Sequence, residues 1–356
     1  MRNKEYLGRM ATAKHRKVLQ KAIERAKVLH STFGEKATPL LRTHEGADPD
    51  GIGAMKFLQG YLEARYQLAS HIYTGPILFT SRPLANRLAI DAVDVPTTEG
   101  MLFVLDTCAK PLLNGNDFVR DRTTVIDHHV PDITSIDAAF MVRNPNAVST
   151  CEMLASLVPL KYINEEGAFA LAVGIASDTE RLRVAERRTI AIFERLLRIA
   201  KVKRSDVDEL ADPAWDPRRV LAIGSDMKNV LWDSYLKNGK EWVFAVGLST
   251  IEMPFVLADA LRKLNTNISV ALSEIAEGRF KLSVRIGFAE ADQTGVHAND
   301  IARVISLKLD LPQEQWGGGE IDRAGAIVVG SIERIVNITN LAITEVIDAA
   351  ARKIDF

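Results

Sequence analysis

The segment TTVIDHH, residues 123–129, places a carboxylate and two imidazoles directly after an apolar run. A continuous apolar run is typical of a parallel strand that is covered on both faces. Residues 101–105 form another such run, and Asp106 follows it. Ligands in parallel sheets bind beyond the carboxyl ends of the strands, so we expect these polar side chains to gather at one edge.

A second polar group lies upstream, where His44, Asp48 and Asp50 follow the apolar run 39–43. A helix is expected from residue 51 onward. Asp48 and Asp50 therefore have two interpretations. They cap this helix, as aspartate often does, or they point at different metal ions.

Helical patterns alternate with the strands of the first half, which predicts an α/β domain with a parallel sheet and right-handed crossovers. The second half mixes strands and helices and contains a hairpin over 268–286, which predicts a smaller α+β domain. Residues 201–238 are rich in aspartate and contain two prolines, and we expect a linker there with a bridging helix at 221–238. The expected parts are a helical extension (1–35), the α/β domain (36–200), the linker (201–238) and the second domain (239–356).

The composition is that of an ordinary globular protein, with 47% apolar and 26% charged residues in 356. A net charge of −1 disfavours a long duplex nucleic acid as partner. Cys108 and Cys151 cannot make a disulfide framework, which favours a reducing, cytoplasmic setting. Cys108 is interpreted as a small buried residue rather than a ligand. No apolar stretch reaches the ~18 residues of a membrane span, so no membrane partner is expected.

A basic amphipathic pattern covers residues 4–27. A helix of this kind can touch a membrane or a nucleic acid. More often it packs on its own domain or on a second subunit with its charges solvated. We favour the packing interpretation, which leaves a homodimer open.

Metal binding explains the polar residues better than separate structural roles do. Asp127, His128 and His129 are costly to desolvate at a strand end unless they are paired or bound to metal. Asp178 adds a carboxylate after the apolar helix expected over 168–176. Carboxylates with some imidazole suit Mn²⁺ or Mg²⁺. Two such ions side by side are the usual means of hydrolysing a phosphate ester or anhydride.

In order and spacing, these segments resemble the four motifs of the DHH phosphoesterase superfamily. Residues 147–152 resemble the helix start that follows the DHH motif, and residues 283–285 and 317–319 resemble two substrate-binding segments of the family's C-terminal domain. The resemblance covers about residues 36–356. It is strongest to the short two-domain branch of nanoRNases, phosphoadenosine-phosphate phosphatases and cyclic-dinucleotide phosphodiesterases.

The resemblance implies a catalytic centre with two Mn²⁺ ions, or Mg²⁺ in their place. One ion would be held by His44 and Asp48, the other by Asp50, His128 and Asp178, with Asp106 bridging them. His129 would face the scissile phosphate, and Asp127 would orient the histidines.

The resemblance also implies an active site in the cleft between the DHH domain and a DHH-associated domain. Arg285 would clamp a phosphate, and Gly317, Gly318 and Gly319 would offer backbone N–H groups to an anion. The family has histidine where this chain has Glu320. Arg323 would neutralise Glu320 or replace it as a substrate contact.

These features predict a Mn-dependent phosphodiesterase or phosphatase, an oligoribonuclease among them, acting on a small nucleotide or short oligonucleotide. One alternative is a pyrophosphatase or polyphosphatase of the same superfamily. The other is a nucleotide-binding regulator without activity. Metal content distinguishes the regulator, because a sensor need not hold two ions.

Overall fold

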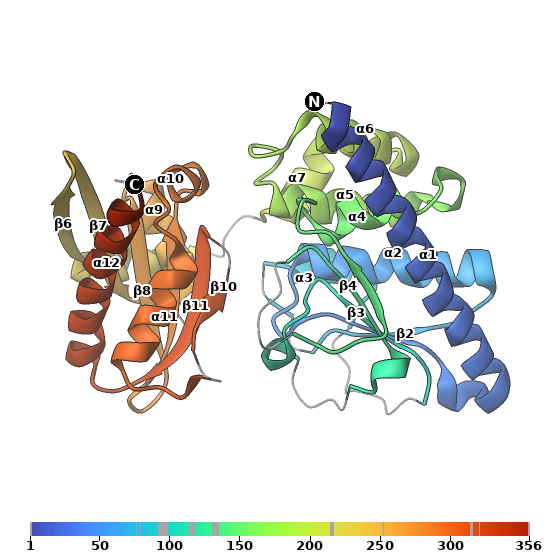
Figure 1. Cartoon of the computed structure of the whole chain (residues 1–356), viewed down its shortest axis with the longest axis horizontal. Helices are drawn as coiled ribbons and strands as arrows, with labels where there is room; N and C mark the ends of the chain where they lie inside the picture. Colours follow the sequence, from blue (N-terminus) through green and yellow to red (C-terminus); the bar gives the residue numbers. More distant parts are fainter. Residues whose placement is uncertain are drawn as a thin grey trace. The chain divides into compact units, whose positions relative to one another are not determined.

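The computed structural model describes residues 2–75, 77–78, 80–91, 99–113, 118–129, 135–213, 217–251, 253–313, 316–319 and 321–354. The chain divides into two compact units, Met1–Ala214 and Trp215–Phe356. The boundary falls inside the region where the linker was expected. Each unit contains its own sheet and its own apolar core (Figure 1).

Unit 1 is built on a five-stranded sheet in which every pairing is parallel, as predicted. The strands in spatial order are β2 (His71–Tyr73), β1 (Leu40–Arg42), β3 (Leu102–Leu105), β4 (Thr123–Asp127) and β5 (Phe140–Arg143). All four residues of β3 are buried. Its sequence is apolar throughout because both faces of the strand are covered.

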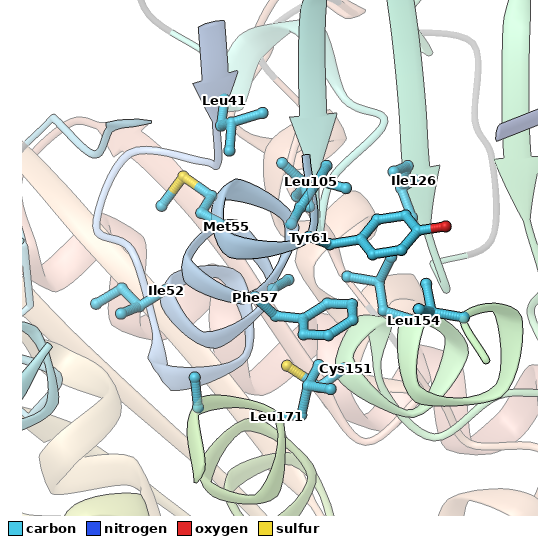
Figure 2. Packing of buried hydrophobic residues seen from close by; sticks show 14 of the residues in the cluster. Leu41, Ile52, Met55, Phe57, Tyr61, Leu105, Ile126, Cys151, Leu154 and Leu171 are labelled. Carbon is cyan, nitrogen blue, oxygen red and sulfur yellow. The ribbon is translucent and has the colours of Figure 1, made fainter. Parts of the chain in front are cut away.

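The described residues of unit 1 also form seven helices: α1 (Arg2–Phe33), α2 (Pro49–Tyr66), α3 (Arg82–Arg87), α4 (Thr150–Leu157), α5 (Glu165–Asp178), α6 (Arg187–Ala200) and α7 (Arg204–Ala211). The strand side chains Leu41, Leu105 and Ile126 pack against α2 and its neighbours in the main core (Figure 2). Leu102 and Val104 point to the opposite face and join a smaller cluster. Successive side chains of β3 therefore enter the two clusters in turn.

Helix α1 packs on unit 1, in agreement with the favoured interpretation of the basic pattern. Leu19, Ile23 and Leu29 are buried in the main core. Arg16 Nε donates to the Leu157 carbonyl at 2.8 Å, which fixes α1 against the end of α4. The lysine and arginine side chains described between residues 14 and 27 are exposed to solvent, as that interpretation requires.

The helices α2 and α5 approach closely because glycine occupies the contact. A Cβ atom at Gly53 would lie 2.4 Å from the Ala170 carbonyl oxygen. A Cβ atom at Gly174 would lie 2.4 Å from Cys151 Sγ and 2.9 Å from Asp50 Oδ1. These two glycines let the helical layer close around Asp50.

Unit 2 has a six-stranded sheet in the order β10-β11-β9-β8-β7-β6. All its pairings are antiparallel except β7 with β8, so the prediction of an α+β domain is confirmed. Its strands are β6 (Leu231–Lys237), β7 (Lys240–Leu248), β8 (Ile268–Ala276), β9 (Arg279–Ile286), β10 (Gly318–Gly319) and β11 (Arg323–Val329). Its helices are α8 (Pro217–Asp226), α9 (Pro254–Lys263), α10 (Phe288–Thr294), α11 (Ala298–Lys308) and α12 (Ile332–Ile354).

The bridging helix expected at 221–238 is wrong in its second part. Helix α8 ends at Asp226, and residues 231–237 form strand β6. A two-residue turn, Asn238-Gly239, joins β6 to β7, and both of its residues have positive φ (50° and 76°). Asn-Gly is a strong hairpin signal, and it outweighs the helical spacing before it.

None of the described helices carries an apolar stretch long enough to cross a bilayer.

Candidate metal centre

The ends of three neighbouring strands bring the predicted residues together. Asp106 follows β3 directly, Asp127 is the last residue of β4, and His44 lies two residues beyond β1. Asp178 reaches the same edge from the last residue of α5. This arrangement follows from the parallel order β1-β3-β4, because the carboxyl ends of parallel strands meet at one edge.

Asp106 is the common member of three groups of side chains that could hold a metal ion. His44 Nε2 lies 3.7 Å from Asp106 Oδ2 and 3.8 Å from Asp48 Oδ1. His128 Nε2 lies 3.5 Å from Asp106 Oδ1 and 3.4 Å from Asp178 Oδ2. The three groups are His44, Asp48 and Asp106; Asp50, Asp106, His128 and Asp178; and Asp106, His128 and His129. In each group the candidate ligand atoms lie within 4.8 Å of one another.

The chemistry of these donors fits divalent cations. His128 Nε2 is buried and has no hydrogen-bond partner among the described residues, although it faces the carboxylates of Asp106 and Asp178. Burial raises the pKa of Asp50 well above its ordinary value, and the nearby charges of Asp106 and Asp178 raise it further. A bound cation would relieve this repulsion and would satisfy the histidine nitrogen.

The same carboxylates also raise the pKa values of the histidines, although burial acts on a histidine in the opposite direction. Burial alone would lower the pKa of His128, but Asp106 and Asp178 outweigh it and hold that pKa well above 6.5. The pKa of His44 is likewise raised by Asp106 and Asp48 against the effect of burial. Without metal the centre therefore holds protons in place of ions, and metal binding must displace them.

The start of α4 fixes Asp50, a contact that the sequence did not reveal. The backbone N–H groups of Thr150 and Cys151 donate to Asp50 Oδ2 and Oδ1 at 2.7 and 2.9 Å. The Thr150 hydroxyl donates to Asp106 Oδ1 at 3.1 Å. Ser149 caps α4 by accepting from the Glu152 N–H. The available signal was this Ser-x-x-Glu pattern, which marks a helix N-terminus and hence a place for an anion.

Asp48 caps the helix, as one interpretation of the sequence predicted, and it also belongs to one of the groups that could hold a metal ion. Its Oδ1 accepts from the Gly51 N–H at 3.0 Å and caps α2. The same carboxylate lies beside His44. Asp50 does not cap the helix, because it is the second residue of α2 and its oxygens face α4.

Asp127 supports His129 and not His128. His129 Nδ1 donates to Asp127 Oδ1 at 2.7 Å, and the His129 backbone N–H donates to the same oxygen at 3.2 Å. The Asp127 side chain is fully buried, whereas that of His129 is 37% exposed. Burial opposes protonation of His129, but Asp127 and Asp106 raise its pKa above 6.5. The ring is thus held in one orientation by Asp127 and remains partly open to solvent.

Asp106 has a backbone conformation that few residues adopt. Its φ is +60°, in the left-handed region, which aspartate tolerates better than most residues. Its N–H still donates to the Ile126 carbonyl at 2.9 Å, so the turn begins directly at the strand end. Backbone strain of this kind is concentrated at functional sites.

Four of the predicted substrate-binding residues, Arg285, Gly318, Gly319 and Arg323, line an open cavity of about 270 Å³ in unit 2. Arg285 Nε donates to Asp259 Oδ1 at 2.9 Å, and Arg285 Nη1 donates to Ser283 Oγ at 3.0 Å. Arg323 lies directly opposite Arg285 across the β9–β11 pair. Each of the two arginines has a carboxylate beside it, since Arg323 Nε lies 3.8 Å from Asp322 Oδ1. The cavity is lined by Pro254, Phe255, Lys281, Leu282, Ser283, Arg285, Gly318, Gly319, Arg323, Ala324 and Gly325.

The three glycines, which the resemblance expects to offer backbone N–H groups to an anion, belong partly to the sheet. Gly318 and Gly319 form the short strand β10 against β11. The Gly317 N–H donates to Ser306 Oγ at 3.1 Å, so this amide is used inside the unit. Gly318 and Gly319 line the cavity, whereas Glu320 lies outside the described residues.

Residues 40–175 match the family model described as the DHH family, N-terminal domain. This part of the chain is a DHH-family domain. It contains all the candidate metal ligands except Asp178, three residues beyond the match. A search of curated proteins found no match to the sequence.

Two solved structures show a similar fold. An exopolyphosphatase-related protein from Bacteroides fragilis is 19% identical, with a TM-score of 0.65, and the match covers 95% of this chain and 98% of the other. The DHH domain of a member of a ribosomal protein family is 14% identical, with a TM-score of 0.54, and the match covers 95% and 97%. At these identities the similarity concerns the fold alone. The chain thus contains a DHH-family domain with clustered groups that could bind metal.

Proposed function

We propose that this DHH protein is a Mn²⁺-dependent phosphoesterase that hydrolyses a phosphodiester or phosphomonoester bond of a small nucleotide or short oligonucleotide. The observation that carries the proposal is the position of Asp106 between two groups of donors. One group adds His44 and Asp48, and the other adds Asp50, His128 and Asp178. A shared carboxylate between two donor sets suits a pair of ions.

The residues of the DHH domain would hold the ions as these two groups. Bound divalent ions would activate a water and neutralise charge on the phosphate. Thr150 keeps Asp106 in place through its hydroxyl, and the amides at the start of α4 hold Asp50. These contacts hold the carboxylates of Asp106 and Asp50 in place. They do not involve His128 Nε2, which therefore remains available to a metal ion.

His129 is the residue suited to act on the substrate. Asp127 holds its Nδ1, which leaves the other ring nitrogen for the phosphate or the leaving oxygen. Asp127 and Asp106 raise its pKa against the effect of burial, which favours the protonated ring. A protonated imidazole can stabilise charge on the phosphate and donate a proton to the departing alkoxide.

The cavity of unit 2 would hold a part of the substrate away from the reacting bond. Arg285, Arg323 and Lys281 line it and suit a phosphate, and Phe255 offers an apolar ring beside them. An aromatic ring next to cations favours a nucleotide, because a base can stack while its phosphate is bound. Pyrophosphate would contact the cations but would have no group to stack on the Phe255 ring. We therefore rank a pyrophosphatase second.

The test is a hydrolysis screen of the metal-loaded protein on dinucleotides, a cyclic dinucleotide, phosphoadenosine phosphate and pyrophosphate. We expect turnover of at least one nucleotide with Mn²⁺ and none after chelation. Asp106→Asn is the control for contaminating enzymes, and it should be inactive on the same substrate. Turnover of pyrophosphate alone would reject the nucleotide substrate. Metal-independent turnover, or none of any substrate with two ions bound, would reject the phosphoesterase.

A further inference from the structure

Strand β6 forms one edge of the sheet in unit 2, and no strand among the described residues pairs with its outer side (Figure 1). It carries three large exposed apolar side chains, with Leu231 54%, Trp232 47% and Leu236 70% exposed. Proteins usually protect such an edge with charges, bulges or a covering segment, because it is a template for another strand. Its seven residues are long enough for a stable pairing.

The hairpin geometry shows which backbone groups of β6 point outward. Because the turn Asn238-Gly239 has two residues, the flanking pair Lys237 and Lys240 is hydrogen-bonded. The backbone N–H and C=O groups of every second residue of β6 then bond to β7, and those of the residues in between point away from β7. Ser234 is one of the latter, since its N–H points away from β7 and donates to the Asp233 side chain at 2.8 Å, a bond that a pairing strand would have to replace. The outward groups are those of Trp232, Ser234 and Leu236.

We propose that β6 pairs antiparallel with β6 of a second copy of this chain, with the two-fold axis at Ser234. This register joins outward groups to outward groups and makes one continuous sheet from the two copies. Ser234 faces the partner's Ser234, and Trp232 faces the partner's Leu236. The two-fold axis generates this Trp232–Leu236 contact twice, so two apolar cross-strand contacts form on one face.

The other face of the pairing contains no repulsive contact. Asp233 would face the partner's Tyr235, and Leu231 would face the partner's Lys237. Lys237 remains neutralised within its own chain, because its Nζ lies 2.8 Å from Asp348 Oδ1. Shifting the register by two residues toward the start of the strand would set Asp233 against the partner's Asp233, which disfavours that alternative.

Molecular mass in solution tests the pairing with the full chain. We expect light scattering after gel filtration to give twice the 39.3 kDa of the chain. The double variant Trp232→Lys/Leu236→Lys sets lysine against lysine across the axis and should be a monomer. The double variant Trp232→Glu/Leu236→Lys sets opposite charges in the same places and should restore the dimer. Leu341→Lys, at a 59% exposed position on α12, is the matched control and should stay dimeric.

A crosslink at the axis tests the register itself. Residues directly opposite in a hydrogen-bonded pair have Cα atoms about 5.5 Å apart, within reach of a disulfide. Oxidised Ser234→Cys should therefore run as a covalent dimer, while Leu236→Cys, two residues from the axis, should not. The native Cys108 and Cys151 are buried and do not interfere. A monomeric native chain, a dimer that survives the double lysine variant, or equal crosslinking at both positions would overturn the proposal.

Discussion

At the scale of single residues, Asp106 and His128 determine what the centre can do. Asp106 is buried among His44, His128 and the Thr150 hydroxyl. Burial opposes its ionisation, but the two histidines outweigh that effect and hold the pKa of Asp106 well below its usual range. The low pKa favours the charged carboxylate, which is the form that accepts a cation.

Replacing Asp106 with asparagine should abolish ion binding while the fold persists. Asparagine keeps the size of the side chain and tolerates the left-handed backbone at φ +60°, which alanine does less well. We expect both ions and nearly all turnover to be lost. Metal analysis and far-UV circular dichroism measure the two effects. A variant that keeps two ions would show that Asp106 does not join the two donor groups.

His128→Ala and His129→Ala should differ in metal content. His128 faces two carboxylates through a nitrogen with no hydrogen bond to the described residues, so its loss should lower ion occupancy. His129 is held by Asp127, and its loss should keep the ions but reduce the rate about 10²–10⁴-fold, as for a positioned acid–base group. Occupancy is measured by metal analysis and kcat on the loaded variants. Equal loss of metal from both would contradict the division of roles.

At the scale of elements, the parallel pairing of β1, β3 and β4 could be predicted, because helical patterns alternate with apolar runs that signal covered strands, but the strand order was not predicted. The polar residue after each run could be predicted with it. The role of α4 in holding Asp50 could not be predicted, because Thr150 and Asp50 are 100 positions apart in the chain. Strand β6 was missed because its exposed faces lack the apolar pattern of a buried strand.

The glycines of α2 give a matched pair of variants. Gly53→Ala places a methyl group against the Ala170 carbonyl and should destabilise the protein by about 1–3 kcal/mol through overpacking. Gly60→Ala in the same helix meets only an ordinary contact at 3.8 Å and should stabilise by about 0.4–1 kcal/mol. Urea unfolding measures both. Stabilisation by Gly53→Ala would mean that α2 and α5 can separate freely.

At the scale of the whole molecule, the two units have separate cores and can be observed separately. All four tryptophans of the chain lie at or beyond Trp215, so tryptophan fluorescence reports unit 2 alone. Five of the six tyrosines lie in unit 1. Circular dichroism at helical wavelengths reports both units.

Mn²⁺ should therefore raise one melting transition and leave the other unchanged. An ion at about 100 times its Kd adds about 2.7 kcal/mol to the unit that binds it. For a unit of about 200 residues this shifts Tm by about 5–11 °C. We expect the shift in circular dichroism but not in tryptophan fluorescence, and chelator should reverse it. A fluorescence transition that moves equally would mean that the units unfold together.

The two backbone amides that donate to Asp50, at the start of α4, can serve as spectroscopic probes of the metal centre. In ¹H–¹⁵N correlation spectra, the Thr150 and Cys151 resonances report on the charge of the carboxylate to which they donate. Diamagnetic Mg²⁺ would shift them, and paramagnetic Mn²⁺ would broaden them beyond detection. Resonances from the far end of unit 1 would supply the internal reference. Ion binding can thus be followed at individual residues without adding any substrate.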